Sequence, residues 1–247
     1  MIKFVRRIYN RYFSPEKEFV LRLRRLLGFT PAYLNVFKLA FSHKSSNEAN
    51  RTKPYGGQNN ERLEYLGDAV LGTIVAEYLY KKYPTADEGF LTKMRSKIVK
   101  RKSLNAIGND MGLDELLSTY NNTRIARSML GNAVEALVGA VYVEQGYSGT
   151  THFVVQRMLR DYVDIETLET YDDNYKSQLL EHCQKNGQKV DYEILKRFKQ
   201  DKRDRFRVAV MINGRRMAVG EDYNKKSAEQ QASRRALQDL GLSVELP

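Results

Sequence analysis

Residues 60–68 read Asn60-Glu61-Arg62-Leu63-Glu64-Tyr65-Leu66-Gly67-Asp68 and lead into the apolar run Ala69-Val70-Leu71-Gly72-Thr73-Ile74-Val75-Ala76. On a helix, Glu61, Glu64 and Asp68 share an arc of about 60°. The apolar run predicts that this helix enters a core, where unpaired carboxylates are costly. A hard divalent cation such as Mg²⁺ would offset that cost. The alternative is a solvated acidic helix face.

The charge distribution along the chain points to a polyanionic partner. The 247 residues suit one or two domains, and the net charge is +11. Residues 1–30 hold eight Lys and Arg against two Asp and Glu, whereas residues 31–171 hold seventeen against sixteen. Residues 172–247 hold sixteen against twelve. A nearly neutral middle with basic flanks suits an acidic centre beside surfaces that attract phosphates.

Several classes of protein are disfavoured by the composition. Cys183 is the only cysteine, so the chain forms no internal disulfide, and zinc-ligand spacing is absent. The sequence contains no apolar run of about 18 residues and no secretory h-region. We therefore expect a cytoplasmic protein with no membrane partner.

Periodicity divides the chain into two different patterns. Helical signals continue to about residue 166, with Ser14-Pro15 predicting a helix start, Gly28 its end, one long helix over residues 87–102 and another over residues 128–145. After a polar linker, a helix over residues 174–185 precedes three strands at residues 191–198, 205–212 and 215–220, and a last helix at residues 225–240. The expected fold is multidomain: an all-α domain followed by a small α-β-β-β-α domain. We place a basic extension at residues 1–15, the first domain at 16–167, the linker at 168–173 and the second domain at 174–242.

The basic residues 1–13 leave three interpretations open. They can form an extra helix packed on the first domain, an arm that contacts nucleic acid, or a short organellar presequence.

The acidic stretch resembles the signature of the ribonuclease III family, endonucleases specific for double-stranded RNA. The match runs over nine consecutive positions, and further segments resemble the family in the same order. These are residues 39–45, which contain His43, residues 87–95, residues 131–140, which contain a second acidic motif, and residues 174–241, which resemble a double-stranded-RNA-binding domain.

The resemblance implies a role for each acidic residue. It makes Glu64, Asp68 and Glu135 metal ligands and Glu61 a supporting acid of the same catalytic group. Asn132 stands where many members carry Asp, and its amide oxygen can still ligate. The expected cofactor is Mg²⁺, with Mn²⁺ able to substitute. His43 is expected to be structural, and Tyr65 and Leu66 are candidates for a dimer interface or for core packing.

In the second domain, the resemblance and the helix pattern indicate contacts to duplex RNA, whose deep major groove leaves shape, phosphates and 2′-hydroxyls to be recognised. We expect Ser177, Glu181 and Gln184 to face a minor groove and Lys202 to lie in the first hairpin loop. Lys225 and Lys226 begin the last helix, where cations and backbone amides suit phosphates.

The resemblance implies a homodimer, joined through the endonuclease domain, that hydrolyses double-stranded RNA. Its products would carry 5′-phosphate and 3′-hydroxyl ends with short 3′ overhangs, and its substrates would be rRNA precursors and structured mRNA. The alternative is a catalytically impaired RNA-binding or ribosome-associated protein with the same fold. Asn132 is the observation that favours this alternative.

Overall fold

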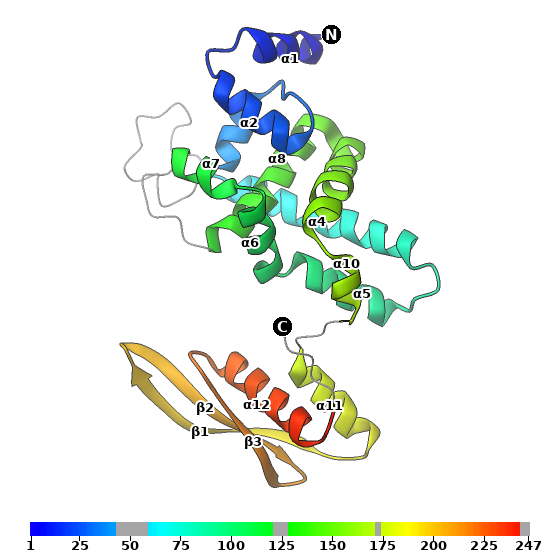
Figure 1. Cartoon of the computed structure of the whole chain (residues 1–247), viewed down its shortest axis with the longest axis vertical. Helices are drawn as coiled ribbons and strands as arrows, with labels where there is room; N and C mark the ends of the chain where they lie inside the picture. The colour runs from blue at the N-terminus through cyan, green and yellow to red at the C-terminus, as the bar shows by residue number, and fades with distance from the viewer. Residues whose placement is uncertain (43–58, 121–127, 171–173, 243–247) are drawn as a thin grey trace. The chain divides into compact units, whose positions relative to one another are not determined.

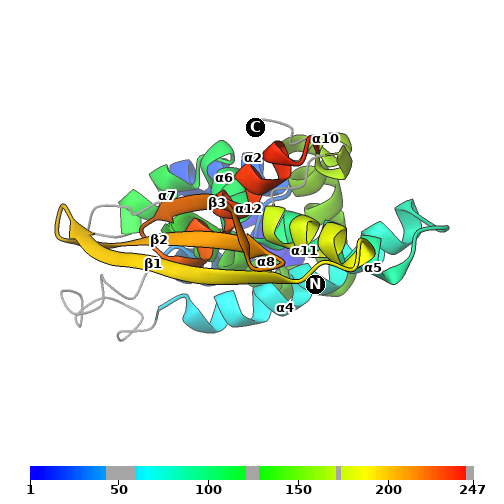
Figure 2. The same cartoon turned by 90° about the horizontal axis from the view of Figure 1, so that it is seen from below.

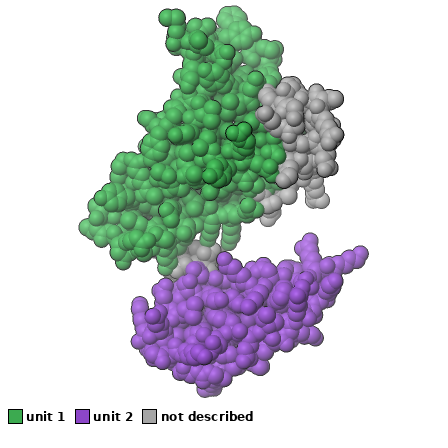
Figure 3. All heavy atoms as spheres, turned by 180° about the vertical axis from the view of Figure 1, so that it is seen from behind, with its two compact units in different colours: residues 1–168 green, residues 169–247 purple. Residues whose placement is uncertain are grey.

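The computed structural model describes residues 1–42, 59–120, 128–170 and 174–242, and these form two compact units. Unit 1 spans Met1–Leu168 and unit 2 spans Glu169–Pro247 (Figures 1 and 3). The segment around His43, most of the polar stretch 47–59 and residues 171–173 of the expected linker lie outside the described residues.

Unit 1 is helical throughout its described part, as the sequence predicted. Its α-helices and one π-helical turn are α1 (Ile2–Tyr12), α2 (Lys17–Leu27), α3 (Leu34–Ala40), α4 (Glu61–Lys82), α5 (Glu88–Val99), α6 (Arg101–Asp110), α7 (Leu113–Tyr120), α8 (Ser128–Phe153), η2 (Val154–Leu159), α9 (Arg160–Tyr162) and α10 (Ile165–Thr170). The last two residues of α10 already belong to unit 2. The sequence signature therefore begins α4, and the second acidic motif lies near the start of α8.

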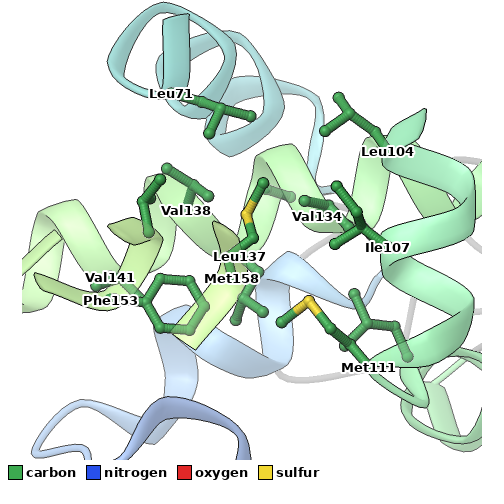
Figure 4. Packing of buried hydrophobic residues seen from close by; sticks show 14 of the residues in the cluster. Leu71, Leu104, Ile107, Met111, Val134, Leu137, Val138, Val141, Phe153 and Met158 are labelled. Atoms are coloured by element: carbon green, nitrogen blue, oxygen red, sulfur yellow. The ribbon is translucent and has the colours of Figure 1, made fainter. Parts of the chain in front are cut away.

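The core of unit 1 forms around α8. Figure 4 shows Val134, Leu137, Val138 and Val141 of this helix packed among apolar side chains from α4, α6 and η2. Each labelled α8 side chain is at most 1% exposed. Burying such a side chain stabilises a fold by about 1.5–3 kcal/mol. This packing therefore fixes the position of α8 and of the polar residues that lie on the same helix.

Two predicted helix boundaries were wrong. The helix expected over residues 87–102 is two helices, because Lys100 adopts an extended ψ of 145° between α5 and α6. The helix expected to begin at Ser14-Pro15 begins at Lys17, and the Ser14 hydroxyl instead accepts a hydrogen bond from the Glu16 N–H (3.1 Å). The helix that begins at Ser128 does end at Gly146 as predicted (φ 70°, ψ −172°), and a further helical stretch follows to Phe153 within α8.

Unit 2 has the predicted α-β-β-β-α order: α11 (Tyr175–Lys185), β1 (Val190–Gln200), β2 (Arg203–Ile212), β3 (Arg215–Asp222) and α12 (Lys225–Asp239). The strands form an antiparallel sheet in the order β1-β2-β3 (Figure 2). Asn213 and Gly214 both have positive φ (50° and 77°) and make the tight turn between β2 and β3. The sheet and the two helices share one hydrophobic core, to which α11 contributes Leu179 and Cys183 and α12 contributes Ala232.

None of the described helices is both long and apolar enough to cross a membrane.

Candidate active site

A close crossing of α4 and α8 builds the site. A Cβ placed on Gly67 would lie 1.7 Å from the carbonyl oxygen of Glu135, and one placed on Gly139 would lie 2.2 Å from the carbonyl oxygen of Leu63. Any other residue at either position would clash with backbone, so the two glycines allow the helices to approach each other. Glu64 and Asp68 flank Gly67 on α4 and are thereby brought to Glu135 on α8.

The electrostatics of Glu135 reflect this arrangement. Burial and the charges of Asp68 and Glu64 together raise the pKa of the half-buried Glu135 carboxyl to about 7, although the Arg101 guanidinium opposes the shift. Three acids from two helices therefore act on one another across the crossing. A cation bound among them would relieve both the repulsion and the cost of burial.

Glu64, Asp68 and Glu135 do not form a preassembled metal-binding site. Among the described residues, no three His, Cys, Asp or Glu side chains converge closely enough to hold a metal ion. Glu64 and Glu135 are half-buried and Asp68 is exposed. The chemistry of this donor set still fits a hard cation, because Mg²⁺ takes one or two carboxylates and keeps several waters.

Asn132 lies one helical turn before Glu135 and is half-buried. No described residue forms a hydrogen bond with its side chain. The start of its helix is fixed by Asn105 of α6, whose Oδ1 accepts a hydrogen bond from the Gly131 N–H (2.8 Å). The sequence offered no sign of this contact, because an Asn in a helix with an apolar face is usually a solvated residue.

Glu61 lies at the exposed start of α4. Asn59 Nδ2 donates to Glu61 Oε2, and the Glu61 N–H donates to Asn59 Oδ1, both at 3.0 Å. Asn60 is 1% exposed, and its amide donates to the Ala40 carbonyl (3.2 Å) while its N–H donates to the Ser42 carbonyl (2.9 Å). The first residue of the signature is thus an anchor that fixes where the acidic helix begins, a role that sequence analysis missed.

The basic run between the two acidic helices divides into separate roles. Lys97 is 7% exposed and donates to the Leu168 carbonyl (2.6 Å), so it is a structural residue. Arg101 is exposed at the start of α6, and its charge acts on Glu135. Arg101 is therefore a cation whose charge lowers the pKa of Glu135 and favours its ionised form.

In unit 2, the three residues expected to face a minor groove share one stripe of α11. Ser177, Glu181 and Gln184 are spaced four and three residues apart, and all three are at least partly exposed. The Ser177 hydroxyl accepts a hydrogen bond from Asn174 Nδ2 (2.8 Å), and Asn174 Oδ1 accepts one from Gln230 of α12 (2.9 Å). This chain of hydrogen bonds ties the start of α11 to α12.

The remaining basic candidates are also on the surface. Lys202 is exposed in the turn between β1 and β2, where its φ is 62°. Lys225 and Lys226 are exposed in the first turn of α12, behind Asn224, whose side chain accepts a hydrogen bond from the Ser227 N–H (2.8 Å). Lys225 Nζ lies 3.7 Å from the Glu229 carboxylate, and Lys176 Nζ pairs with the same carboxylate at 2.6 Å.

Comparisons with known proteins agree with this architecture. The family described as Ribonuclease-III-like matches residues 34–162, and the double-stranded RNA binding motif matches residues 175–240. A protein named Ribonuclease 3 from Azobacteroides pseudotrichonymphae is 40% identical over 223 residues, which are 90% of this chain and 85% of that protein. One of the same name from Zunongwangia profunda is 42% identical over 234 residues, 94% of this chain and 95% of that protein.

Among solved structures, the nuclease domain of a ribonuclease III from Campylobacter jejuni is 30% identical with a TM-score of 0.49, over 58% of this chain and 98% of that one. The two matched family regions and the extent of similarity to the curated relatives decide the assignment. The chain belongs to the ribonuclease III family of double-stranded-RNA endoribonucleases and carries one nuclease domain followed by one double-stranded-RNA-binding domain.

Proposed function

We propose that this chain hydrolyses phosphodiester bonds of double-stranded RNA with Mg²⁺, leaving 5′-phosphate and 3′-hydroxyl ends with short 3′ overhangs. The observation that carries the proposal is the crossing at Gly67, which sets Glu64 and Asp68 against a Glu135 carboxyl whose pKa is raised to about 7. Groups with strongly shifted pKa values cluster at functional sites.

The family membership implies dependence on a divalent metal, and the residues present fit one. Glu64, Asp68, Glu135 and the amide oxygen of Asn132 would hold it, and all four are oxygen donors of the kind that Mg²⁺ and Mn²⁺ prefer. A bound divalent ion would supply an activated water and would stabilise the leaving 3′ oxygen. Glu61, held by Asn59, would support this group from the start of α4.

The chain's own residues would position the RNA. Lys225 and Lys226 would hold phosphates at the start of α12, Ser177, Glu181 and Gln184 would follow the minor groove, and Lys202 would extend the contact from the β1–β2 turn. These contacts fix the duplex without reading its bases, since A-form RNA hides them in its deep major groove. The proposed boundaries remain an extension at 1–15, a nuclease domain at 16–167, a linker at 168–173 and an RNA-binding domain at 174–242.

We also propose that two copies pair through the nuclease domain. Tyr65 on α4 is 83% exposed, which is unusual for a large aromatic side chain. It borders a pocket of about 790 Å³ that is lined mainly by apolar side chains, among them Leu39, Leu66 and Val143. A two-fold axis would let Tyr65 of each copy enter the pocket of the other, because such interfaces are self-complementary.

The expected substrates are precursors of rRNA and structured mRNA in the cytoplasm. The sequence also left open a catalytically impaired RNA-binding or ribosome-associated protein, and Asn132 is the only observation that favours this alternative.

One experiment separates the two functions. An end-labelled RNA duplex is incubated with the full chain in Mg²⁺, in Mn²⁺ or in EDTA, and the ends of the products are mapped. We expect cleavage with either metal and none in EDTA. Glu135→Ala should abolish cleavage but bind the duplex normally, since it removes no phosphate contact, while Glu166→Ala serves as a matched control and should cut normally. Duplex binding without cleavage by the unchanged chain would favour the alternative.

A further inference from the structure

Helix α1 is attached to unit 1 through its polar side. Lys3 Nζ donates to the carbonyl oxygen of Glu144 (2.7 Å), and the Arg7 guanidinium pairs with the Glu144 carboxylate (3.2 Å). Asn10 is 8% exposed and donates to two backbone carbonyls in the segment before α3 (2.8 and 3.2 Å). The structure thus supports the first of the three interpretations of this segment, an extra helix packed on the domain.

The anchoring carboxylate is itself firmly held. Glu144 is 0% exposed, and it accepts hydrogen bonds from the backbone N–H groups of Ala32 and Tyr33, both at 3.1 Å. The Arg6 guanidinium lies 5.1 Å above the Tyr33 ring. These contacts fix not only the position of α1 but also its rotation about its own axis.

The fixed rotation turns the apolar side of the helix outward. At 100° per residue, its apolar side chains cover roughly half of the circumference. We call them the outer face, and each is 41–69% exposed: Ile2, Phe4, Val5, Ile8, Tyr9, Tyr12 and, just after the helix, Phe13. Scattered exposed apolar residues are ordinary, but a continuous stripe of this kind marks an interaction surface.

The charges around the outer face are almost all positive. Arg6 and Arg11 lie at its two edges, both are exposed, and within the described part of the chain neither forms an ion pair. Residues 1–30 hold eight basic and two acidic residues, a net of +6. The two acids, Glu16 and Glu18, are already paired with Lys38 and Arg22.

We propose that α1 lies flat on an anionic lipid surface, with the outer face inserted among the acyl chains and Arg6 and Arg11 at the headgroups. Helices that bind membranes in this way combine an apolar face containing Phe with flanking Lys or Arg. A second copy is a poorer occupant, because two ends with this excess of positive charge repel each other. Duplex RNA offers no apolar surface to cover the stripe. This proposal departs from the expectation of no membrane partner, because a helix that lies on a bilayer surface needs neither a long apolar run nor a secretory signal.

Docking in this way leaves the candidate active site free. Glu144 lies nine residues after Glu135 on α8, which is a rise of about 13 Å along the helix. Figure 1 shows α1 at one end of unit 1, beside α2.

The chain contains no tryptophan, so a single introduced Trp reports on one site. In the full chain, Phe4→Trp places this probe on the outer face, and Tyr80→Trp places it at a 71% exposed position on α4 as the control. We expect the Phe4→Trp emission to shift to the blue with phosphatidylglycerol-containing vesicles, and neither variant to shift with pure phosphatidylcholine vesicles. The Tyr80→Trp emission should not shift with either vesicle.

A second measurement separates apolar docking from general attraction of a basic protein. Phe4→Gln/Ile8→Gln should weaken sedimentation with the anionic vesicles roughly tenfold or more, because two inserted side chains are lost. Tyr80→Gln/Ile194→Gln removes two other exposed apolar side chains and should leave sedimentation unchanged. Arg6→Gln/Arg11→Gln should reduce the preference for anionic over neutral vesicles. Circular dichroism and duplex binding check that each variant is folded.

Three results would overturn the proposal. The first is the absence of a blue shift of Phe4→Trp with anionic vesicles. The second is an equal loss of sedimentation in the two Gln double variants, which would mean that the outer face has no special role. The third is a blue shift that appears without vesicles as protein concentration rises, because it would assign the outer face to a second copy.

Discussion

The carbonyl oxygen of Glu135 lies against Gly67, so closely that a Cβ at that position would be 1.7 Å away. One glycine therefore connects the stability of the nuclease domain to the position of its acids. Glu64 and Asp68 face Glu135 because nothing larger than hydrogen stands between the two helices.

This contact predicts a large loss of stability in Gly67→Ala. The added methyl group must push α4 and α8 apart, and overpacking of this kind costs about 1–3 kcal/mol or more. Gly72→Ala is the matched control, because it lies in the same helix with no atom within 4 Å of its added Cβ. Its free energy of unfolding should be unchanged or higher by up to about 1 kcal/mol, the helix preference of Ala over Gly. Urea unfolding measures both, and equal stability of the two variants would refute the close crossing.

The raised pKa of Glu135 predicts a dependence of stability on pH. A carboxyl whose pKa is higher in the folded than in the unfolded chain contributes stability at low pH, and that contribution is lost as pH rises through about 7. Glu135→Gln keeps the group neutral. In EDTA at pH 8, this variant should therefore be more stable than the unchanged protein by roughly 1–3 kcal/mol.

The same comparison at pH 4.5 should give nearly equal free energies of unfolding, because the carboxyl is then largely protonated in the folded chain. Glu166→Gln changes an exposed acid in the same unit and should show no such pH dependence. If Glu135→Gln gained no stability between pH 4.5 and pH 8, the acids would not interact across the crossing.

The sequence predicted the order of elements because its strongest signals are local. The apolar run after Asp68 predicted the buried helix, and alternation with Asn213-Gly214 predicted the sheet. It could not predict contacts between distant segments. The pairing of Gly67 with Glu135 and the burial of Lys97 against Leu168 join positions 68 and 71 residues apart. The outward direction of the apolar face of α1 depends on a buried Glu144 that no pattern near residue 1 reveals.

The start of α12 predicts a measurable salt effect on RNA binding. Replacing Lys225 and Lys226 with Ala should weaken binding to all duplex sequences alike and lower the log–log salt slope by about two at most. Lys226→Ala alone should cost more than Lys225→Ala, because Lys225 is partly neutralised by Glu229 (3.7 Å). Lys81→Ala/Lys82→Ala removes a matched pair of exposed lysines from unit 1 and should change the slope little. Selective loss on some sequences, or an unchanged slope in the α12 variant, would exclude a phosphate role.

The Asn at position 132 predicts that the enzyme needs a higher Mg²⁺ concentration for cleavage than a variant with Asp there. It lies one turn before Glu135, and in the proposed metal site its amide would supply a neutral oxygen where a carboxylate would add charge. Because affinity for Mg²⁺ grows with the charge of its ligands, Asn132→Asp should reach half-maximal cleavage at a several-fold lower Mg²⁺ concentration. Asn109→Asp adds the same charge at an exposed position on α6 and should leave the midpoint where it is. Titrating the cleavage rate with Mg²⁺ for all three proteins decides the matter. If Asn132→Asp had the same or a higher midpoint than the unchanged enzyme, Asn132 would not face the metal, and Glu135 would be the only ligand that α8 supplies.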